Sequence, residues 1–247
     1  QSIVTQVLPI DLQAVQSTYR LLRLNLDAVP HSTPPRLAGL TANAQALLHR
    51  LYQGLVAPLD AALRGYPRWI VVPYGPLHYL PFQALYDGAE YLVERHEISY
   101  LPGASLLRFC LEPRQAAAGV AVFGHSFDGQ LPNAVQEAQG IHAILGGDLY
   151  VEQEATSACF RATAGHRNAL HLAAHGGFRP DNPLFSGLAL ADSWLTTLDI
   201  FNLRLNASLV TLSACQTGRR TIGGGDELLG LMRALLYAGA ARLVLPL

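Results

Sequence analysis

The most informative stretch of this sequence is Ser208-Leu-Val-Thr-Leu-Ser-Ala-Cys215-Gln-Thr-Gly218, an apolar run that ends in a cysteine and a turn. A second apolar run, Asn168-Ala-Leu-His-Leu-Ala-Ala-His175-Gly-Gly177, ends in a histidine followed by two glycines. Short apolar runs bounded by turn residues are typical of buried strands. We predict that the two strands are parallel neighbours, so that Cys215 and His175 meet at the carboxyl edge, where open α/β sheets build their sites.

A thiol beside an imidazole has a clear chemical use. The thiol is a weak nucleophile until a nearby base takes its proton, which His175 can do for Cys215. In peptide hydrolysis the sulfur would attack the scissile carbonyl, and the imidazole would carry the proton to the leaving amine. The backbone N–H groups of Gly176 and Cys215, at the two turns, are the candidate donors to the oxyanion. The pair therefore predicts a cysteine peptidase.

Structural roles compete with these assignments. A single cysteine at the end of a core strand is usually a small buried hydrophobe. His171 lies four residues before His175 and could suggest a metal site with Cys215, but strand residues at that spacing lie roughly 13 Å apart. We therefore predict no metal site, a packed His171, and an internal hydrogen-bonding role for Ser213.

Strand and helix patterns alternate along the chain, which predicts an α/β protein with a mainly parallel sheet, helices on both faces and an N-terminal helical segment. A long loop is expected from Gly176 to about Thr197. The expected helices cover residues 13–26, 37–63, 105–111, 133–145, 156–164, 198–203 and 226–237, and the expected strands cover 69–73, 91–101, 119–124, 150–151, 168–177, 208–215 and 242–247.

Six short motifs occur in a fixed order along the chain. They are Pro73-Tyr-Gly-Pro-Leu-His-Tyr-Leu-Pro-Phe82, Leu131-Pro-Asn-Ala-Val-Gln-Glu-Ala138, His171-Leu-Ala-Ala-His-Gly176, Gly187-Leu-Ala-Leu-Ala-Asp192, Leu212-Ser-Ala-Cys-Gln-Thr-Gly218 and Gly225-Asp-Glu-Leu-Leu-Gly230. Together they resemble the CHAT family of caspase-like peptidases, which are related to caspases and separases and often attached to TPR repeats. The resemblance covers roughly Leu55 to the end of the chain. It implies a caspase-like α/β fold and a catalytic dyad of His175 and Cys215.

The family resemblance also shapes the expected domain organisation. We divide the chain into a helical segment, 1–65, and a caspase-like CHAT peptidase domain, 66–247. The first segment is expected to be a cap of this domain or the tail of an upstream helical repeat region. The family usually continues past the last strand, so we expect the peptidase domain to be truncated at its C-terminus. We also expect a repeat or sensor region, in the same chain or a partner, to regulate the domain.

Composition limits the expected partners and compartment. The chain has 17 Lys and Arg against 18 Asp and Glu, without a basic run, so we expect protein or peptide substrates and no direct contact with nucleic acid or membrane. Its three separated cysteines, Cys110, Cys159 and Cys215, form neither a disulfide framework nor a zinc spacing. Reduced thiols suit a cytoplasmic protein, and the family resemblance implies a bacterial-type enzyme. We expect no cofactor.

Three acidic residues are further candidates. Asp192, Asp226 and Glu227 could face a basic substrate residue, and solvated side chains or helix caps are the structural alternative. The turn Gly223-Gly-Gly-Asp226 could hold a phosphate at a helix start, but it lacks the Lys-Ser/Thr of a P-loop, and the two acids would repel an anion.

Two other functions are open on the sequence alone. One is a catalytically silent interaction module that keeps the family fold. The other is a thiol hydrolase that acts on small molecules, which would need a closed pocket rather than an open groove.

Overall fold

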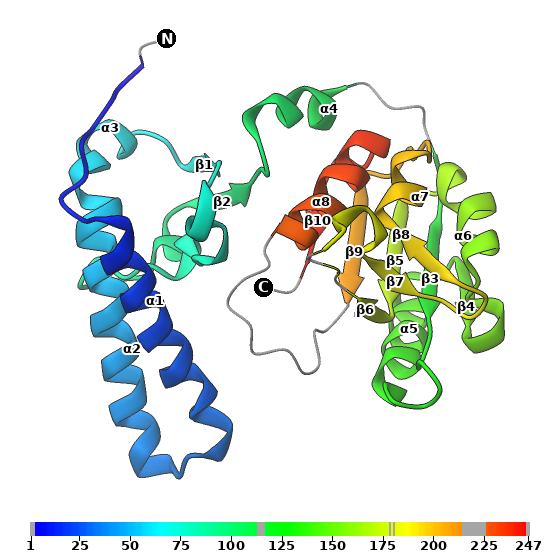
Figure 1. The fold of residues 1–247 in the computed structure, drawn as a ribbon, viewed down its shortest axis with the longest axis horizontal. Coiled ribbons are helices and arrows are strands. Elements are labelled where there is room, and N and C mark those ends of the chain that lie inside the picture. Colours follow the sequence, from blue (N-terminus) through cyan, green and yellow to red (C-terminus); the bar gives the residue numbers. More distant parts are fainter. Residues whose placement is uncertain (1–2, 113–116, 178, 180, 214–225, 246–247) are drawn as a thin grey trace. The chain divides into compact units, whose positions relative to one another are not determined.

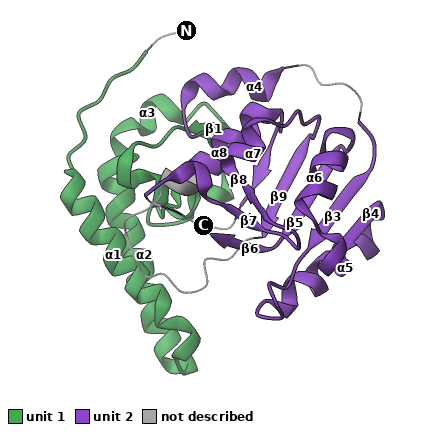
Figure 2. Ribbon diagram, turned by 45° about the vertical axis from the view of Figure 1, so that its right-hand side comes forward, with its two compact units in different colours: residues 1–101 green, residues 102–247 purple. Residues whose placement is uncertain are grey.

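The computed structural model describes residues 3–112, 117–177, 179, 181–213 and 226–245, and the side chains of 226–228 are not described. The chain forms two compact units, Gln1–Leu101 and Pro102–Leu247 (Figure 2). Each unit has its own hydrophobic core, so each is described by itself. The predicted boundary at 65/66 stays a prediction, and the boundary between the compact units lies at 101/102.

The first unit begins with two helices that lie side by side, α1 (Leu12–Asp27) and α2 (Pro34–Leu55) (Figure 1). The Asp11 side chain caps α1 by accepting a hydrogen bond from the Ala14 N–H. The predicted helix 37–63 is too long, because α2 ends at Leu55 and a 3-10 turn, Ala57–Leu59, and the short α3 (Asp60–Leu63) follow. Pro58 explains this break, since proline removes a helical N–H donor and disfavours helix in the residue before it.

Strand β1 (Arg68–Val71) pairs in parallel with β2 (Glu97–Tyr100) in the same unit. The predicted strand 91–101 is therefore wrong in its first half, where Leu92–Glu94 forms a 3-10 turn closed by a hydrogen bond from Tyr91 N–H to Glu94. The core of this unit consists of apolar side chains from α1, α2 and the turns, namely Val15, Leu22, Leu48, Leu51, Tyr52, Leu55, Val56, Leu80, Leu85 and Leu92.

The second unit contains the predicted parallel sheet, in the order β10-β9-β5-β3-β4. Its strands are β3 (Val120–Gly124), β4 (Asp148–Val151), β5 (Ala169–Ala173), β9 (Leu209–Ser213) and β10 (Leu243–Val244). All its neighbouring strands are parallel, so the predicted α/β class is confirmed.

The helices of this unit cover both faces of the sheet. They are α4 (Leu107–Leu111), α5 (Pro132–Leu145), α6 (Ser157–Thr163), α7 (Thr197–Phe201) and α8 (Asp226–Ala238). Alternate strand residues such as Phe123 and Leu172 pack in one core with side chains of α6, α7 and α8. The strand residues that alternate with these face α5. One of them is Gly124, which lets this helix approach, because an added Cβ would lie 2.6 Å from the Ala138 Cβ.

The segment predicted as a long loop from Gly176 to Thr197 instead forms a second sheet. Strands β6 (His175–Gly177), β7 (Gly187–Ala189) and β8 (Trp194–Thr196) pair in antiparallel order. The prediction was wrong because strands of three residues are too short to show an alternating pattern. The predicted single strand 168–177 is also divided, since β5 ends at Ala173 and His175 begins β6.

Candidate functional site

The carboxyl edge of the parallel sheet gathers the ends of three strands. Gly124 of β3 is in register with Ala173 of β5, and Ala173 is in register with Ser213 of β9. Just beyond the strand ends, backbone hydrogen bonds still join neighbouring segments. The His125 N–H donates to the Ala173 carbonyl (2.9 Å), and the Ala174 N–H donates to the Ser213 carbonyl (3.3 Å). The predicted parallel neighbours are therefore confirmed, and His175 lies two residues beyond the registered pair.

The imidazole of His175 lies among aromatic rings. Phe127 stacks on it with a centroid distance of 4.5 Å and an interplanar angle of 24°. Trp194 approaches edge-on, with its ring centroid 6.0 Å from that of His175 and 6.4 Å from that of Phe127. We call these three residues the aromatic bracket. The half-buried His175 ring is thus held by contacts from the β3–α5 loop and from β8.

The loop that carries Phe127 is backbone-strained. Phe127 and Asp128 have φ of 52° and 55°, a left-handed conformation that bulky side chains rarely adopt. The Gln130 and Leu131 N–H groups close the turn onto the carbonyls of Phe127 and Ser126. Conformations of this kind cost on the order of 1–3 kcal/mol each and cluster at functional sites.

A polar cluster lies on the α5 face of the sheet. Glu137 accepts a hydrogen bond from Ser213 Oγ (2.9 Å), and its Oε1 lies 3.2 Å from Nε2 of the buried His171. That nitrogen has no aligned hydrogen-bond partner among the described residues. Burial lowers the pKa of His171, and the nearby Glu137 carboxylate, which acts in the opposite direction, does not outweigh it. The predicted packing of His171 and hydrogen bonding of Ser213 are confirmed.

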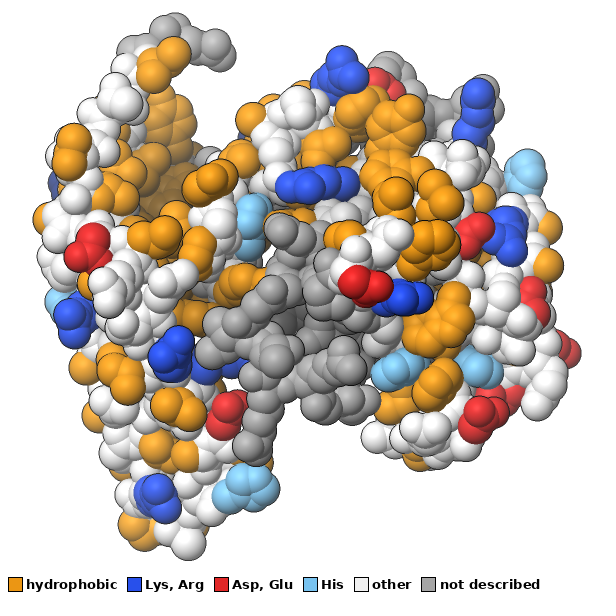
Figure 3. Space-filling view, viewed as in Figure 1, with side chains coloured by type: hydrophobic (Ala, Val, Ile, Leu, Met, Phe, Trp, Pro, Cys, Tyr) orange, Lys and Arg blue, Asp and Glu red, His pale blue; other side chains and the backbone are white. Residues whose placement is uncertain are grey.

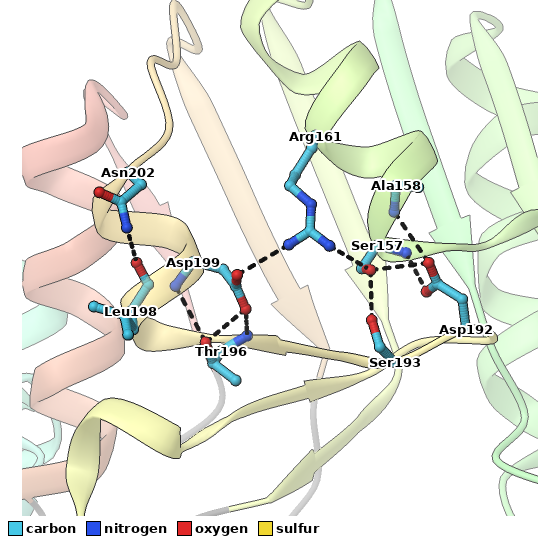
Figure 4. A network of polar contacts seen from close by, with 9 residues as sticks. All are labelled: Ser157, Ala158, Arg161, Asp192, Ser193, Thr196, Leu198, Asp199 and Asn202. Atoms are coloured by element: carbon cyan, nitrogen blue, oxygen red, sulfur yellow. Dashed lines mark hydrogen bonds and ion pairs between the residues drawn. The ribbon is translucent and has the colours of Figure 1, made fainter.

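Asp192 binds the start of α6. Its carboxylate accepts hydrogen bonds from the Ser157 N–H (2.6 Å), the Ser157 hydroxyl (3.0 Å) and the Ala158 N–H (3.3 Å) (Figure 4). Burial acts to raise the pKa of the Asp192 carboxyl, but these hydrogen bonds prevail and hold the pKa below its usual value. These contacts fit the structural alternative, a helix cap, better than a carboxylate that is free to bind a substrate.

The same network continues towards α7. Arg161 donates to Ser157 Oγ (2.9 Å) and pairs with Asp199 (3.0 Å), which forms a capping box with Thr196 (Figure 4). The chain of contacts therefore joins α6 to the end of β8 and the start of α7.

Several predicted site residues lie wholly or partly outside the described part of the structure. Cys215 is not described, and neither are the side chains of Asp226 and Glu227, although both residues belong to α8. Gly176 is described: it is buried in β6 and in register with Leu188 of β7. The oxyanion role of its N–H stays a prediction.

Sequence reasoning missed two residues that contact His175, Phe127 and Trp194, and two others at this side of the sheet, His125 and Glu137. His125 follows β3 as His175 follows β5, so the same strand-end rule could have singled it out. Glu137 lay inside a quoted motif without an assigned role. Phe127 and Trp194 gave no local signal, because their contacts with His175 join segments 48 and 19 residues apart.

Charges are mixed on the described surface. On the face of each unit shown in Figure 3, acidic and basic side chains are interspersed, and hydrophobic side chains lie among them. Within the described part of the chain, no helix combines the length and apolar character needed to cross a membrane.

Comparison with known proteins identifies the family. The five-stranded parallel sheet with its helices is consistent with an α/β fold of the caspase-like type. The CHAT domain matches residues 45–247, most of the chain, and the protein therefore belongs to the CHAT family, which is related to caspase-like cysteine peptidases. No curated protein matches the sequence.

Proposed function

We propose that this chain is a caspase-like cysteine endopeptidase that cleaves protein substrates with His175 and Cys215. The observation that carries the proposal is the register of β5 and β9, in which Ala173 is paired with Ser213. His175 and Cys215 each follow this pair by two residues. Since neighbouring strands lie about 4.8 Å apart, the chain leaves the sheet towards His175 and towards Cys215 from two adjacent points.

The proposed reaction has two steps. The Cys215 sulfur attacks the scissile carbonyl carbon as His175 takes the thiol proton, and the carbon–nitrogen bond then breaks while His175 protonates the leaving amine. Water next attacks the thioester carbonyl as His175 takes one of its protons, and the carbon–sulfur bond breaks. His175 returns that proton to the sulfur, and the carboxylic acid product ionises to a carboxylate. Backbone N–H groups of Gly176 and Cys215 would stabilise the oxyanion in both steps.

The biological setting is part of the same proposal. We infer a cytoplasmic, bacterial-type enzyme that requires no cofactor and is controlled by a helical-repeat or sensor region in the same chain or a partner. Asp226 and Glu227 remain our candidates for recognition of a basic substrate residue. Asp192 ranks below them, because its carboxylate already binds α6.

A thiol-reactive peptide library tests the proposal against a silent interaction module. Peptidyl acyloxymethyl ketones should label the wild-type chain at Cys215, labelling should vanish in Cys215→Ala, and it should fall at least about 100-fold in His175→Ala. Cys159→Ala is the matched control and should label like wild type, since this half-buried cysteine of α6 packs against the core and lies 3.9 Å from the Thr163 hydroxyl. Equal labelling of wild type and His175→Ala would favour the silent module.

A further inference from the structure

We propose that Phe127, supported by Trp194, fixes the orientation of the His175 imidazole. The catalytic consequence rests on the proposed peptidase function, whereas the orientation does not. A general base must hold its nitrogen within about 2.6–3.2 Å of the proton that it takes, so the plane of its ring matters. In the described structure, the His175 ring makes two aromatic contacts, one near-parallel stack and one edge contact.

The backbone conformation around Phe127 places its ring against His175. Three non-glycine residues of the described chain have left-handed backbones, Phe127, Asp128 and Glu152, and a hydrogen bond joins their segments, from the Ser126 N–H to Glu152 Oε2 (3.3 Å). The Ser126 hydroxyl also accepts a hydrogen bond from the Gly129 N–H (3.1 Å). Since strained residues persist only where their surroundings hold them, this loop has one defined shape, in which Phe127 lies over His175.

The opposite side of the bracket depends on a residue without a side chain. A Cβ added at Gly177 would collide with the six-membered ring of Trp194. The glycine therefore lets Trp194 lie against the backbone of β6, two residues from His175. Trp194 is 40% exposed, and it contacts both other rings of the bracket edge-on. We infer that it limits rotation of the Phe127–His175 pair.

Nuclear magnetic resonance of the full chain, with labelled histidine, tests the orientation without any substrate. A ring stacked at 4.5 Å should shift the His175 ring protons upfield relative to those of the exposed His31. Phe127→Leu should abolish most of this upfield shift, whereas Phe127→Tyr, which keeps an aromatic ring, should retain it. Trp194→Leu should reduce the shift partly. A His175 signal that does not change in Phe127→Leu would overturn the proposal.

Labelling kinetics test the consequence for the reaction. With a peptidyl acyloxymethyl ketone, Phe127→Leu should lower the maximal labelling rate of Cys215 about tenfold and leave the half-saturating concentration within about twofold. Phe127→Tyr should behave like wild type. An increase in the half-saturating concentration alone would make Phe127 a substrate contact and contradict a positioning role.

Tyr150→Leu is the matched control. It removes a ring stacked at 4.8 Å and 23° on Phe123 in the same sheet, so it should lower the melting temperature without changing the labelling rate. If Tyr150→Leu and Phe127→Leu lower the maximal labelling rate equally, the aromatic bracket contributes only ordinary packing and the inference is overturned. If the wild-type chain is not labelled at all while the resonance results hold, the peptidase proposal fails and the oriented imidazole stands.

Discussion

His171 is buried in the α5 face of the sheet and should make stability depend on pH. Burial lowers its pKa in the folded chain, against the opposing effect of Glu137. In the unfolded chain a histidine takes up a proton near pH 6.5. As the pH falls through about 6.5, the unfolded state therefore binds more protons than the folded state, and the free energy of unfolding decreases until the folded residue is protonated as well.

Chemical denaturation at pH 7.5 and pH 5.5 checks this prediction. Wild type should lose more stability between the two pH values than His171→Leu, which removes the titrating group and leaves the Ser213–Glu137 hydrogen bond in place. His31→Asn, at an exposed histidine, should retain the wild-type difference. The prediction is wrong if His171→Leu and wild type lose the same amount.

His171 and Ser213 also show what could be predicted from the sequence. The strand pattern alone predicted that His171 packs and that Ser213 forms a hydrogen bond, because both follow from position in a buried strand. Their common partner, Glu137, could not be predicted, since it comes from a helix 34 and 76 residues away in the chain. The aromatic contacts of His175 were missed for the same reason.

At the element scale, the small sheet β6–β7–β8 depends on a close backbone approach at Gly187. A Cβ at this position would collide with the Leu195 carbonyl oxygen of the neighbouring strand, and backbone cannot move away as a side chain can. Gly187→Ala should therefore destabilise the protein by about 1–3 kcal/mol or more. Gly140→Ala, on the exposed side of α5 with no neighbouring atom within 4 Å, should be neutral or slightly stabilising. Equal melting temperatures for the two variants would contradict this reading.

The start of α6 gives a second prediction at this scale. Asp192→Ala leaves the Ser157 and Ala158 N–H groups without their acceptor and should cost about 1 kcal/mol of stability. Asp181→Ala, which loses an exposed pair with Arg179, should cost no more than about 0.5 kcal/mol. Substrate preference should not change in Asp192→Ala, and a lost preference for basic residues in cleavage assays would restore its predicted role in binding.

The predictions found the elements that carry an apolar pattern of their own and missed the three-residue strands. The strands β3, β5 and β9 and the helices α1, α5 and α8 have apolar patterns that span the whole element, and the predictions found each of them. The three-residue strands β6, β7 and β8 are specified by pairing with one another, which no local pattern reports. The division at His175 was missed because both β5 and β6 lie in one apolar run.

At the scale of the whole molecule, the two units should respond separately to loss of core packing. The cores of residues 1–101 and 102–247 share no member. Leu51→Ala, at a fully buried position of the first core, should cost about 2–5 kcal/mol and raise hydrogen exchange in α1, α2 and β1. Phe160→Ala should do the same in β3 and β5 of the second unit. Exchange that rises equally in both units for either variant would show a single cooperative core.

The central claim is that one imidazole activates one thiol at the end of the parallel sheet, and the alkylation rate of Cys215 tests it most directly. Iodoacetamide reacts with the thiolate, needs no substrate pocket, and can be mapped to each cysteine by mass spectrometry. We predict that at pH 6 Cys215 reacts at least about tenfold faster in wild type than in His175→Ala, while Cys159 reacts equally in both. Equal Cys215 rates in the two proteins would contradict the account.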